Sequence, residues 1–447
     1  MPGLEIITFG CRLNAFESEV IRGAAGAAGL GDAIIVNTCA VTEEAERQAR
    51  QAIRRARREH PGARIIVTGC AATLAPERYA ALGEVDLVLD NTAKLRPESY
   101  AVAAPHPPAA NAAGPPSPAL RERGSECSGS PTLSRIAGEG ARGRSPRAGE
   151  GLRARAYLQV QQGCDHRCTF CIIPYARGPS RSVPLDAIVE QARDLVAGGT
   201  NEIVLTGVDL TAYGADLPDR PGLGRMVRLL LAAVPELPRL RLSSLDPSEI
   251  DDGLWGLIAN EPRLMPHLHL SLQSGDDLIL KRMKRRHSRA QAIAAAERAR
   301  ALRPEIMLGA DLIAGFPTET EAMFRNTSDL IEQAGLGFVH VFPYSPRPGT
   351  PAARMPQLAP AVIRDRAARL REAAASALAA QLARRVGRVE DVLIEAPGRG
   401  RAACYAPVRF DAAPAIEAGG NGSTAIGSVR PMRFVAAGAS HLIGAAP

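Results

Sequence analysis

Long hydrophobic runs, aromatic residues and lysine are all scarce in this chain of 447 residues. It has no run of eighteen apolar residues, which excludes a membrane-spanning helix of ordinary length. Residues 1–9 show no basic region followed by an apolar stretch, so they do not read as a secretory signal. We therefore expect a cytoplasmic protein that has no membrane partner.

Disulfide bonds are not expected either. The cytosol keeps thiols reduced, so the eight cysteines are better explained by metal binding or redox chemistry. The net charge of +7 comes almost entirely from arginine, because the only lysines are Lys94, Lys281 and Lys284. Guanidinium groups bind phosphate oxygens in pairs, which favours a nucleic-acid partner. A genome rich in G and C would produce the same composition.

The first hundred residues alternate between strand and helix. Candidate strands are residues 5–9, 33–36, 64–68 and 85–89, and candidate helices are 17–28 and 43–59. This order predicts a parallel sheet with helices on its faces, in an N-terminal domain of residues 1–102. Residues 103–151 break the alternation with many Pro, Gly, Ser and Arg residues. We expect a disordered insertion there, in which Cys127 is an incidental thiol.

The alternation resumes in residues 152–385. Candidate strands are 157–161, 202–206, 240–245, 267–272, 307–313 and 338–342, and candidate helices include 186–196, 319–333 and 359–385. Six β/α units predict a partial barrel rather than a complete eight-fold one. Residues 386–447 contain short β-like pieces at 391–395, 405–410 and 433–436, which predict a small β-barrel of an RNA-binding kind. The expected class is therefore α/β: an N-terminal parallel α/β domain, a (β/α)6 partial barrel and a C-terminal β-barrel.

Three cysteines follow the first strand of the expected barrel in a CxxxCxxC spacing: Cys164, Cys168 and Cys171. Three thiolates on one short loop can hold three irons of a [4Fe–4S] cluster and leave the fourth iron open. Active sites of β/α folds lie on the loops that follow the strands, so the position is suitable. A zinc site that uses His166 or a distant fourth ligand is the alternative.

Three further cysteines, Cys11, Cys39 and Cys70, each follow one of the first three strands. Because the carboxyl ends of parallel strands meet at one edge of a sheet, these thiols are expected to converge on a second three-cysteine site. Gly10 and Gly69 precede two of them and would let the backbone bend closely around a cofactor. Three separate buried thiols are the alternative reading. Cys404 belongs to neither group of three cysteines and is expected to be structural.

Together these motifs resemble the radical-SAM methylthiotransferases. The resemblance covers nearly all of the chain outside the insertion and is carried by these stretches: residues 9–14 (FGCRLN), 37–39 (NTC), 68–70 (TGC), the CxxxCxxC loop, 172–178 (IIPYARG), 205–208 (LTGV), 242–245 (LSSL), 269–275 (HLSLQSG) and 311–317 (DLIAGFP). Residues 206–214 and 242–247 are most similar to the branch that acts on N6-threonylcarbamoyladenosine at position 37 of tRNA. The sister branches act on isopentenyladenosine in tRNA or on an aspartate of a ribosomal protein.

The resemblance implies a division of labour between two [4Fe–4S] clusters. The cluster on Cys164, Cys168 and Cys171 would bind S-adenosylmethionine and cleave it to a 5′-deoxyadenosyl radical that removes hydrogen from C2 of the adenine. The cluster on Cys11, Cys39 and Cys70 would present the sulfur, methylated by a second S-adenosylmethionine. The expected contacts to S-adenosylmethionine, for which ordinary turn chemistry is the alternative, are Thr206, Gly207, Ser243, Ser244, Gln273, Ile313, Ala314 and Gly315. Thr318 departs from the family, which usually has glycine after Gly-Phe-Pro.

The implied partners are the anticodon loop of tRNA, an electron donor such as flavodoxin or ferredoxin, and a source of sulfur. The C-terminal piece resembles a TRAM domain, a small RNA-binding barrel. Two basic groups give modest independent support for RNA: Arg47, Arg50, Arg54 and Arg58 on one helix face, and Lys281, Arg282, Lys284, Arg285 and Arg286. Solvated surface is the alternative for each group. A non-catalytic RNA-binding protein with structural zinc is the alternative for the whole chain.

Overall fold

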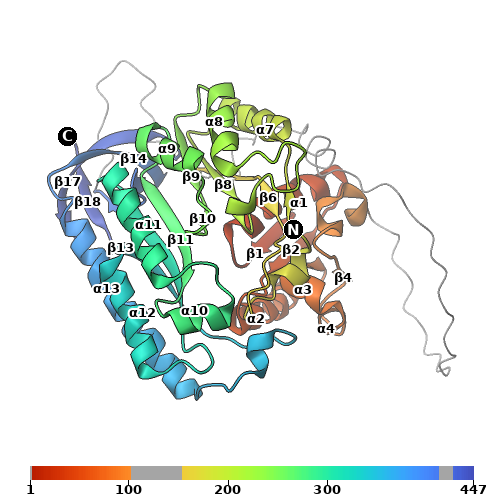
Figure 1. The fold of residues 1–447 in the computed structure, drawn as a ribbon. Coiled ribbons are helices and arrows are strands. Elements are labelled where there is room, and N and C mark those ends of the chain that lie inside the picture. The colour runs from red at the N-terminus through yellow and green to blue at the C-terminus, as the bar shows by residue number, and fades with distance from the viewer. Residues whose placement is uncertain (1–2, 102–153, 412–425) are drawn as a thin grey trace, which may run out of the picture.

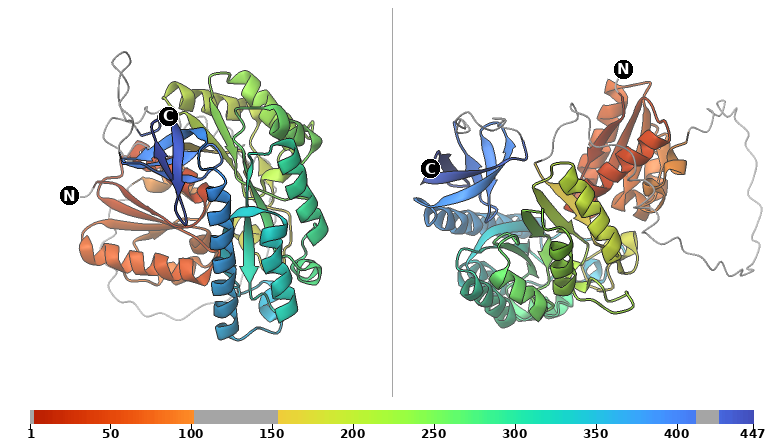
Figure 2. Two further views of the ribbon diagram at one scale, coloured as in Figure 1. Left: turned by 90° about the vertical axis from the view of Figure 1, so that its left-hand side faces the viewer. Right: turned by 90° about the horizontal axis from the view of Figure 1, so that it is seen from above.

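The computed structural model describes residues 3–101, 154–411 and 426–447, which form three successive parts (Figure 1). The expected insertion at 103–151, with Cys127, lies outside the described residues. The N-terminal and C-terminal parts lie on the same side of the central part, next to each other (Figure 2). None of the helices in the described ranges combines the length and apolar character needed to cross a bilayer.

The N-terminal part is a three-layer sandwich. Its strands β1 (Glu5–Thr8), β2 (Ala33–Thr38), β3 (Arg64–Gly69) and β4 (Leu87–Val88) pair in that order and are all parallel. Ile34 and neighbouring side chains pack on one face with Ile53 of helix α2 (Glu43–Glu59). Ile35 packs on the other face with Ile21 of helix α1 (Arg12–Ala27). The predicted parallel sheet is confirmed, since successive strand residues point to opposite faces and both faces are covered by helices.

Shorter elements complete this part. They are helices α3 (Cys70–Leu74) and α4 (Pro76–Ala80) and the 3-10 turns η1 (Ala93–Leu95) and η2 (Pro97–Tyr100). Helix α2 has the bounds that the sequence predicts, whereas α1 begins five residues before the expected start.

The central part contains the six predicted strands as a partial barrel made of two parallel sheets. The first sheet has the order β5 (Ala156–Gln159), β8 (Glu202–Thr206), β9 (Arg239–Leu242), and the second has β10 (Ser244–Leu245), β11 (His267–Gln273), β12 (Met307–Ala314), β13 (Leu336–Pro343). The predicted strand 240–245 is divided at Ser243. The backbone N–H of Ser243 donates to Leu205 in the first sheet, while Ser244 pairs with His269 in the second. One strand therefore joins the two sheets.

Helices cover the outside of this barrel (Figure 1). They are α7 (Leu185–Ala197), α8 (Leu223–Ala233), α9 (Asp252–Asn260), α10 (Asp277–Met283), α11 (Arg289–Leu302) and α12 (Glu321–Gln333), and the long α13 (Pro360–Ala383) packs along β13. Shorter elements are the antiparallel pair of β6 (Gln161–Gln162) and β7 (Arg181–Ser182), helix α6 (Ile173–Arg177) between them, and the 3-10 turns η3 (Leu210–Ala212) and η4 (Pro351–Arg354).

The C-terminal part is a closed five-stranded barrel, as predicted. Its order is β14 (Val389–Ala396), β15 (Arg399–Ala402), β16 (Pro407–Arg409), β18 (Leu442–Ala445), β17 (Val429–Ala437). Side chains such as Ile394, Met432 and Phe434 fill the interior. Cys404 is fully buried in this apolar core. Its surroundings are those of a small hydrophobic residue.

Candidate active site

The loop cysteines Cys164, Cys168 and Cys171 lie just beyond the carboxyl end of the first barrel strand. Gly163 turns the chain into the loop with φ +72, and an added Cβ would overlap the carbonyl of Pro179. Backbone hydrogen bonds then fix the loop: Cys164 N–H donates to Gly178 at 3.1 Å, Cys171 N–H to Cys168 at 3.1 Å, and Thr169 N–H to Met283 at 3.1 Å. These hydrogen bonds hold the backbone of the loop that carries the three thiols.

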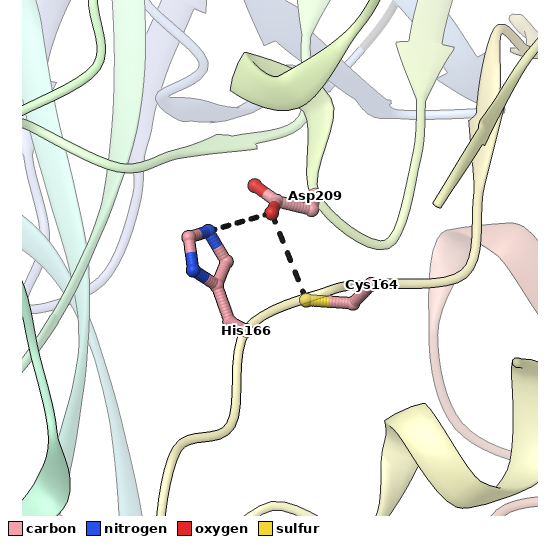
Figure 3. A group of neighbouring side chains, drawn as sticks. All are labelled: Cys164, His166 and Asp209. Atoms are coloured by element: carbon pink, nitrogen blue, oxygen red, sulfur yellow. Dashed lines mark hydrogen bonds and ion pairs between the residues drawn. The ribbon is translucent and has the colours of Figure 1, made fainter. Parts of the chain in front are cut away.

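Charged side chains surround the loop cysteines. Asp209 lies 3.6 Å from Sγ of Cys164 and 2.7 Å from Nε2 of His166 (Figure 3). Arg285 directs Nη1 at Sγ of Cys168 over 3.6 Å and is anchored on Asp246 at 2.7 Å.

Burial affects the ionisation of the loop thiols. It raises the pKa of Cys164 to about 12, with a contribution from Asp209, and it raises the pKa of Cys171 to about 11. The thiols of Cys164 and Cys171 therefore keep their protons at neutral pH. A bound metal or cluster has to displace those protons.

The sheet-edge cysteines Cys11, Cys39 and Cys70 follow β1, β2 and β3, whose last residues are paired side by side. Cys39 and Cys70 are buried and Cys11 is exposed. Burial raises the pKa of Cys39 to about 12, and repulsion from Cys11 and Cys70 adds to the shift. Cys11 and Cys70 thus both lie near Cys39, at the edge of the sheet where the three thiols are predicted to meet.

Glycine shapes this edge as the sequence suggests. Gly10 has φ +93, and an added Cβ would lie 2.6 Å from Sγ of Cys39. Gly69 has φ +97, and an added Cβ would overlap the backbone of Thr38. Both positions require the left-handed backbone that glycine adopts at little cost. The backbone can therefore come close to the cysteines only because these two residues lack a side chain.

Gly69→Ala is expected to lower the free energy of unfolding of the cofactor-free protein by about 2–4 kcal/mol, because backbone strain and overlap with Thr38 add up. Urea unfolding measures the change. Gly83→Ala is the matched control, since an added Cβ there meets nothing within 4 Å and the backbone has no positive φ. Equal stability of the two variants would contradict the assigned backbone geometry.

The spacing of the thiols bears on the zinc alternative. A tetrahedral zinc site with bonds of about 2.3 Å holds its sulfurs about 3.8 Å apart. The described residues contain two groups of three possible ligands within 4.8 Å: Cys164, His166 and Asp209, and His269, Asp311 and His340. Neither three-cysteine set is that compact. Each set offers three thiols, the ligands that iron–sulfur clusters take.

The two cysteine sets meet at the boundary between the N-terminal and central parts. Helix α6 follows Cys171 directly, and its residue Ala176 packs with Cys70 in one apolar cluster. The side chain of Asn91 donates to the carbonyl of Ala176 at 2.9 Å. Cys70 also adds to the pKa shift of Cys171. The two cysteine sets are therefore neighbours across this boundary.

Two known families match separate stretches of the chain. Residues 158–331 match the Radical SAM superfamily, and residues 4–90 match the Uncharacterized protein family UPF0004. The chain is 47% identical to the threonylcarbamoyladenosine tRNA methylthiotransferase MtaB of Rickettsia prowazekii, over 91% of each chain. It is 35% identical to the MtaB of Thermotoga maritima, over 79% of this chain and 77% of the relative. The chain belongs to the radical-SAM tRNA methylthiotransferase family.

A second group of relatives in this family has another name. The tRNA-2-methylthio-N(6)-dimethylallyladenosine synthase of Paracoccus denitrificans is 35% identical, over 89% of this chain and 86% of the relative. The methylthiotransferase described here is therefore an enzyme that transfers a sulfur-containing group. Its cofactors are S-adenosylmethionine and two [4Fe–4S] clusters.

The residues expected to contact S-adenosylmethionine lie at the carboxyl ends of the barrel strands. Thr206 ends β8, Ser243 joins β9 to β10, and Gln273 ends β11 with φ +70. The hydroxyl groups of Thr206 and Ser243 are buried and have no hydrogen-bond partner within the described residues. Two unpartnered hydroxyls at one end of the barrel fit a polar cofactor, since buried polar groups are normally satisfied.

The other expected contacts differ in their surroundings. Gly207 lies against Gln161, and an added Cβ would be 2.9 Å from its Oε1. Ser244 begins β10. Gly315 has φ +77 and donates its N–H to Glu319 at 3.0 Å. Ile313 is almost completely buried in an apolar cluster, and Ala314 is fully buried at the end of β12. The side chains of Ile313 and Ala314 therefore contribute to the core, and the carbonyl of Ala314 accepts from the N–H of Tyr344 at 2.9 Å.

Thr318, which departs from the family pattern, occupies a glycine-like position. Its φ is +67, in the left-handed region that costs a side chain energy. Arg282 donates Nη1 to Oγ1 of Thr318 at 2.7 Å, which holds the threonine in place. The loop thus keeps the backbone path expected for glycine, although the residue has changed.

Several polar residues of the site make contacts that the sequence does not predict. Asp311 on β12 accepts from Nε2 of His269 at 2.9 Å and from Nδ1 of His340 at 3.1 Å. The two histidines lower the pKa of Asp311, although its burial acts in the opposite direction. Arg177 and Arg285 each reach a cysteine of a different set. These residues lie far apart in the sequence, so only the folded chain brings them together.

Proposed function

We propose that this methylthiotransferase adds a methylthio group to C2 of N6-threonylcarbamoyladenosine at position 37 of tRNA. The substrate is inferred from the 47% identity, over 91% of both chains, with a relative named threonylcarbamoyladenosine tRNA methylthiotransferase. Relatives named for dimethylallyladenosine reach 34–36% over similar lengths. The enzyme would work in the cytosol and need an electron donor, such as flavodoxin or ferredoxin, and a source of sulfur.

The loop cysteines are proposed as ligands of the cluster that binds S-adenosylmethionine, and the sheet-edge cysteines as ligands of the second cluster. When bound, the two cofactors supply reductive cleavage of S-adenosylmethionine to a radical and a sulfur to be transferred. The protein places both cysteine sets at one domain boundary. Thr206, Gly207, Ser243, Ser244, Gln273, Ile313 and Gly315 are proposed to position S-adenosylmethionine.

The domain division is also a proposal: residues 1–102 carry the sheet-edge cysteines, 103–151 are an insertion, 152–385 are the radical-SAM part, and 386–447 bind RNA. Part of the basic surface supports the tRNA contact. Arg54 and Arg58 are exposed on α2, and Lys281 and Lys284 are exposed near α10. Such side chains can follow a phosphate backbone while an unstacked base enters the site.

Other members of the two basic groups make contacts within the protein. Arg282 contacts Thr318, and Arg285 contacts Asp246 and Cys168. Arg47 and Arg50 pair with Glu44 and Glu46 of the same helix. The surface proposed for tRNA is therefore smaller than the sequence suggests.

Deletion of the gene is expected to remove the methylthio form of threonylcarbamoyladenosine from cellular tRNA, as measured by mass spectrometry of tRNA nucleosides. Dimethylallyladenosine and its methylthio form serve as the control and should not change. Loss of the dimethylallyl product instead would assign the enzyme to the sister substrate. Unchanged tRNA would contradict the proposal and favour the ribosomal-protein or zinc-binding alternatives.

A further inference from the structure

Arg177 makes a direct contact with the sheet-edge cysteines. It ends α6, the helix that follows the loop cysteines, and its side chain is 2% exposed. Its Nε donates to Sγ of Cys70 at 3.2 Å. The other nitrogens donate to the two carboxylate oxygens of Glu17 at 2.7 and 3.0 Å and to Oδ1 of Asn14 at 2.7 Å. Glu17 and Asn14 therefore fix the guanidinium, and its Nε–H points at sulfur.

Arg177 lies beside a second buried cation, Lys94, and both pair with Glu17. Lys94 lies 2.7 Å from Glu17, and both side chains are fully buried. Burial alone would raise the pKa of Glu17, but Arg177 and Lys94 outweigh it and hold the pKa at about 2. Two cations thus share one carboxylate. Glu17 and Asn14 thus hold the guanidinium so that its Nε–H faces the sulfur of Cys70.

We propose that Arg177 is a positioning residue for the cluster at the sheet edge, where its N–H···S hydrogen bond to Cys70 raises the reduction potential of that cluster. The proposal rests on the proposed function, because it takes Cys70 as a cluster ligand. Hydrogen bonds to cluster sulfurs and nearby positive charge stabilise the reduced form, which carries one more electron. Arg177 also ties Cys70 to the chain segment that leaves the loop cysteines.

The other cysteine set offers an internal comparison. Arg285 is likewise held by a carboxylate, Asp246, and directs Nη1 at Cys168. That contact measures 3.6 Å against 3.2 Å for Arg177 and Cys70. Of the two cysteine sets, Arg285 contacts only the loop cysteines. Its substitution should therefore not affect a cluster at the sheet edge.

The test is a redox titration of the full chain, reconstituted anaerobically and followed by electron paramagnetic resonance. Alanine at Cys164, Cys168 and Cys171 leaves only the sheet-edge cluster to load. In this background, Arg177→Gln is expected to lower the reduction potential of the sheet-edge cluster. At a fixed solution potential, the ratio of oxidised to reduced cluster should rise about tenfold, which corresponds to about 59 mV for one electron. Glu17 keeps Lys94 as its partner in this variant. Arg285→Lys is the matched control and should leave the potential unchanged.

Arg177→Lys keeps the charge and loses the forked geometry, so its potential should fall between those of the parent and Arg177→Gln. If Arg177→Gln does not load iron, a lowered potential in Arg177→Lys still supports the proposal. An unchanged potential in Arg177→Lys, or in a fully loaded Arg177→Gln, overturns it. If the background protein binds no cluster, the ligand assignment fails, and with it the role of Arg177. Failure of the substrate assignment is seen separately, in the tRNA nucleosides.

Discussion

Cys39→Ala is expected to abolish methylthio transfer to tRNA while cleavage of S-adenosylmethionine continues. Cys39 lies at the sheet edge, and its removal leaves only Cys11 and Cys70 to hold the second cluster. The loop cysteines have their own supports, which are hydrogen bonds to Gly178 and Met283 and not to the N-terminal part. The variant should therefore still produce 5′-deoxyadenosine, as measured by chromatography, while the tRNA product falls to the limit of detection.

Cys404→Ala is the matched control for this experiment. Cys404 is also a buried cysteine, but it lies in the apolar core of the C-terminal barrel. The control should keep both activities and the full iron content. If cleavage and transfer fell together in a folded Cys39→Ala protein, the division of labour between the two cysteine sets would be wrong.

Cys171→Ala is expected to abolish cleavage and transfer together. Cys171 donates a backbone hydrogen bond to Cys168 within the loop. Without the thiol of Cys171, only those of Cys164 and Cys168 remain to bind the cluster that takes S-adenosylmethionine. The sheet-edge cysteines are unchanged, so about four irons per chain should remain after anaerobic reconstitution. Iron analysis and 5′-deoxyadenosine formation measure the two effects. Continued cleavage of S-adenosylmethionine in this variant would rule out the loop as the cleavage site.

Features that depend on local sequence were predicted well. Residues 202–206 form a strand with the predicted bounds, because the run is short and rich in β-branched residues, which favours strand over helix. The convergence of Cys11, Cys39 and Cys70 followed from topology, since the carboxyl ends of parallel strands share one edge. Ile313 shows the limit of this reasoning: a position at a strand end does not say whether its side chain faces a ligand or the core.

Side-chain contacts between residues far apart in the sequence, and several element bounds, were not predicted. Arg177 lies 107 residues from Cys70 and 160 from Glu17, and no periodicity links them. The start of α1 at Arg12 was missed because Cys11, its N-cap, makes no side-chain capping hydrogen bond. The C-terminal strands β15 and β18 were missed because each has four residues, which is too few for a clear alternation.

The most direct test of the whole account uses the purified, anaerobically reconstituted chain with S-adenosylmethionine, a reductant and two anticodon stem-loops. One stem-loop carries threonylcarbamoyladenosine and the other dimethylallyladenosine at position 37. Mass spectrometry of the digested RNA should show a methylthio group on the threonylcarbamoyladenosine alone. The account predicts this product with the parent protein and none with Cys39→Ala. Modification of the dimethylallyladenosine, or product formation by Cys39→Ala, would contradict it.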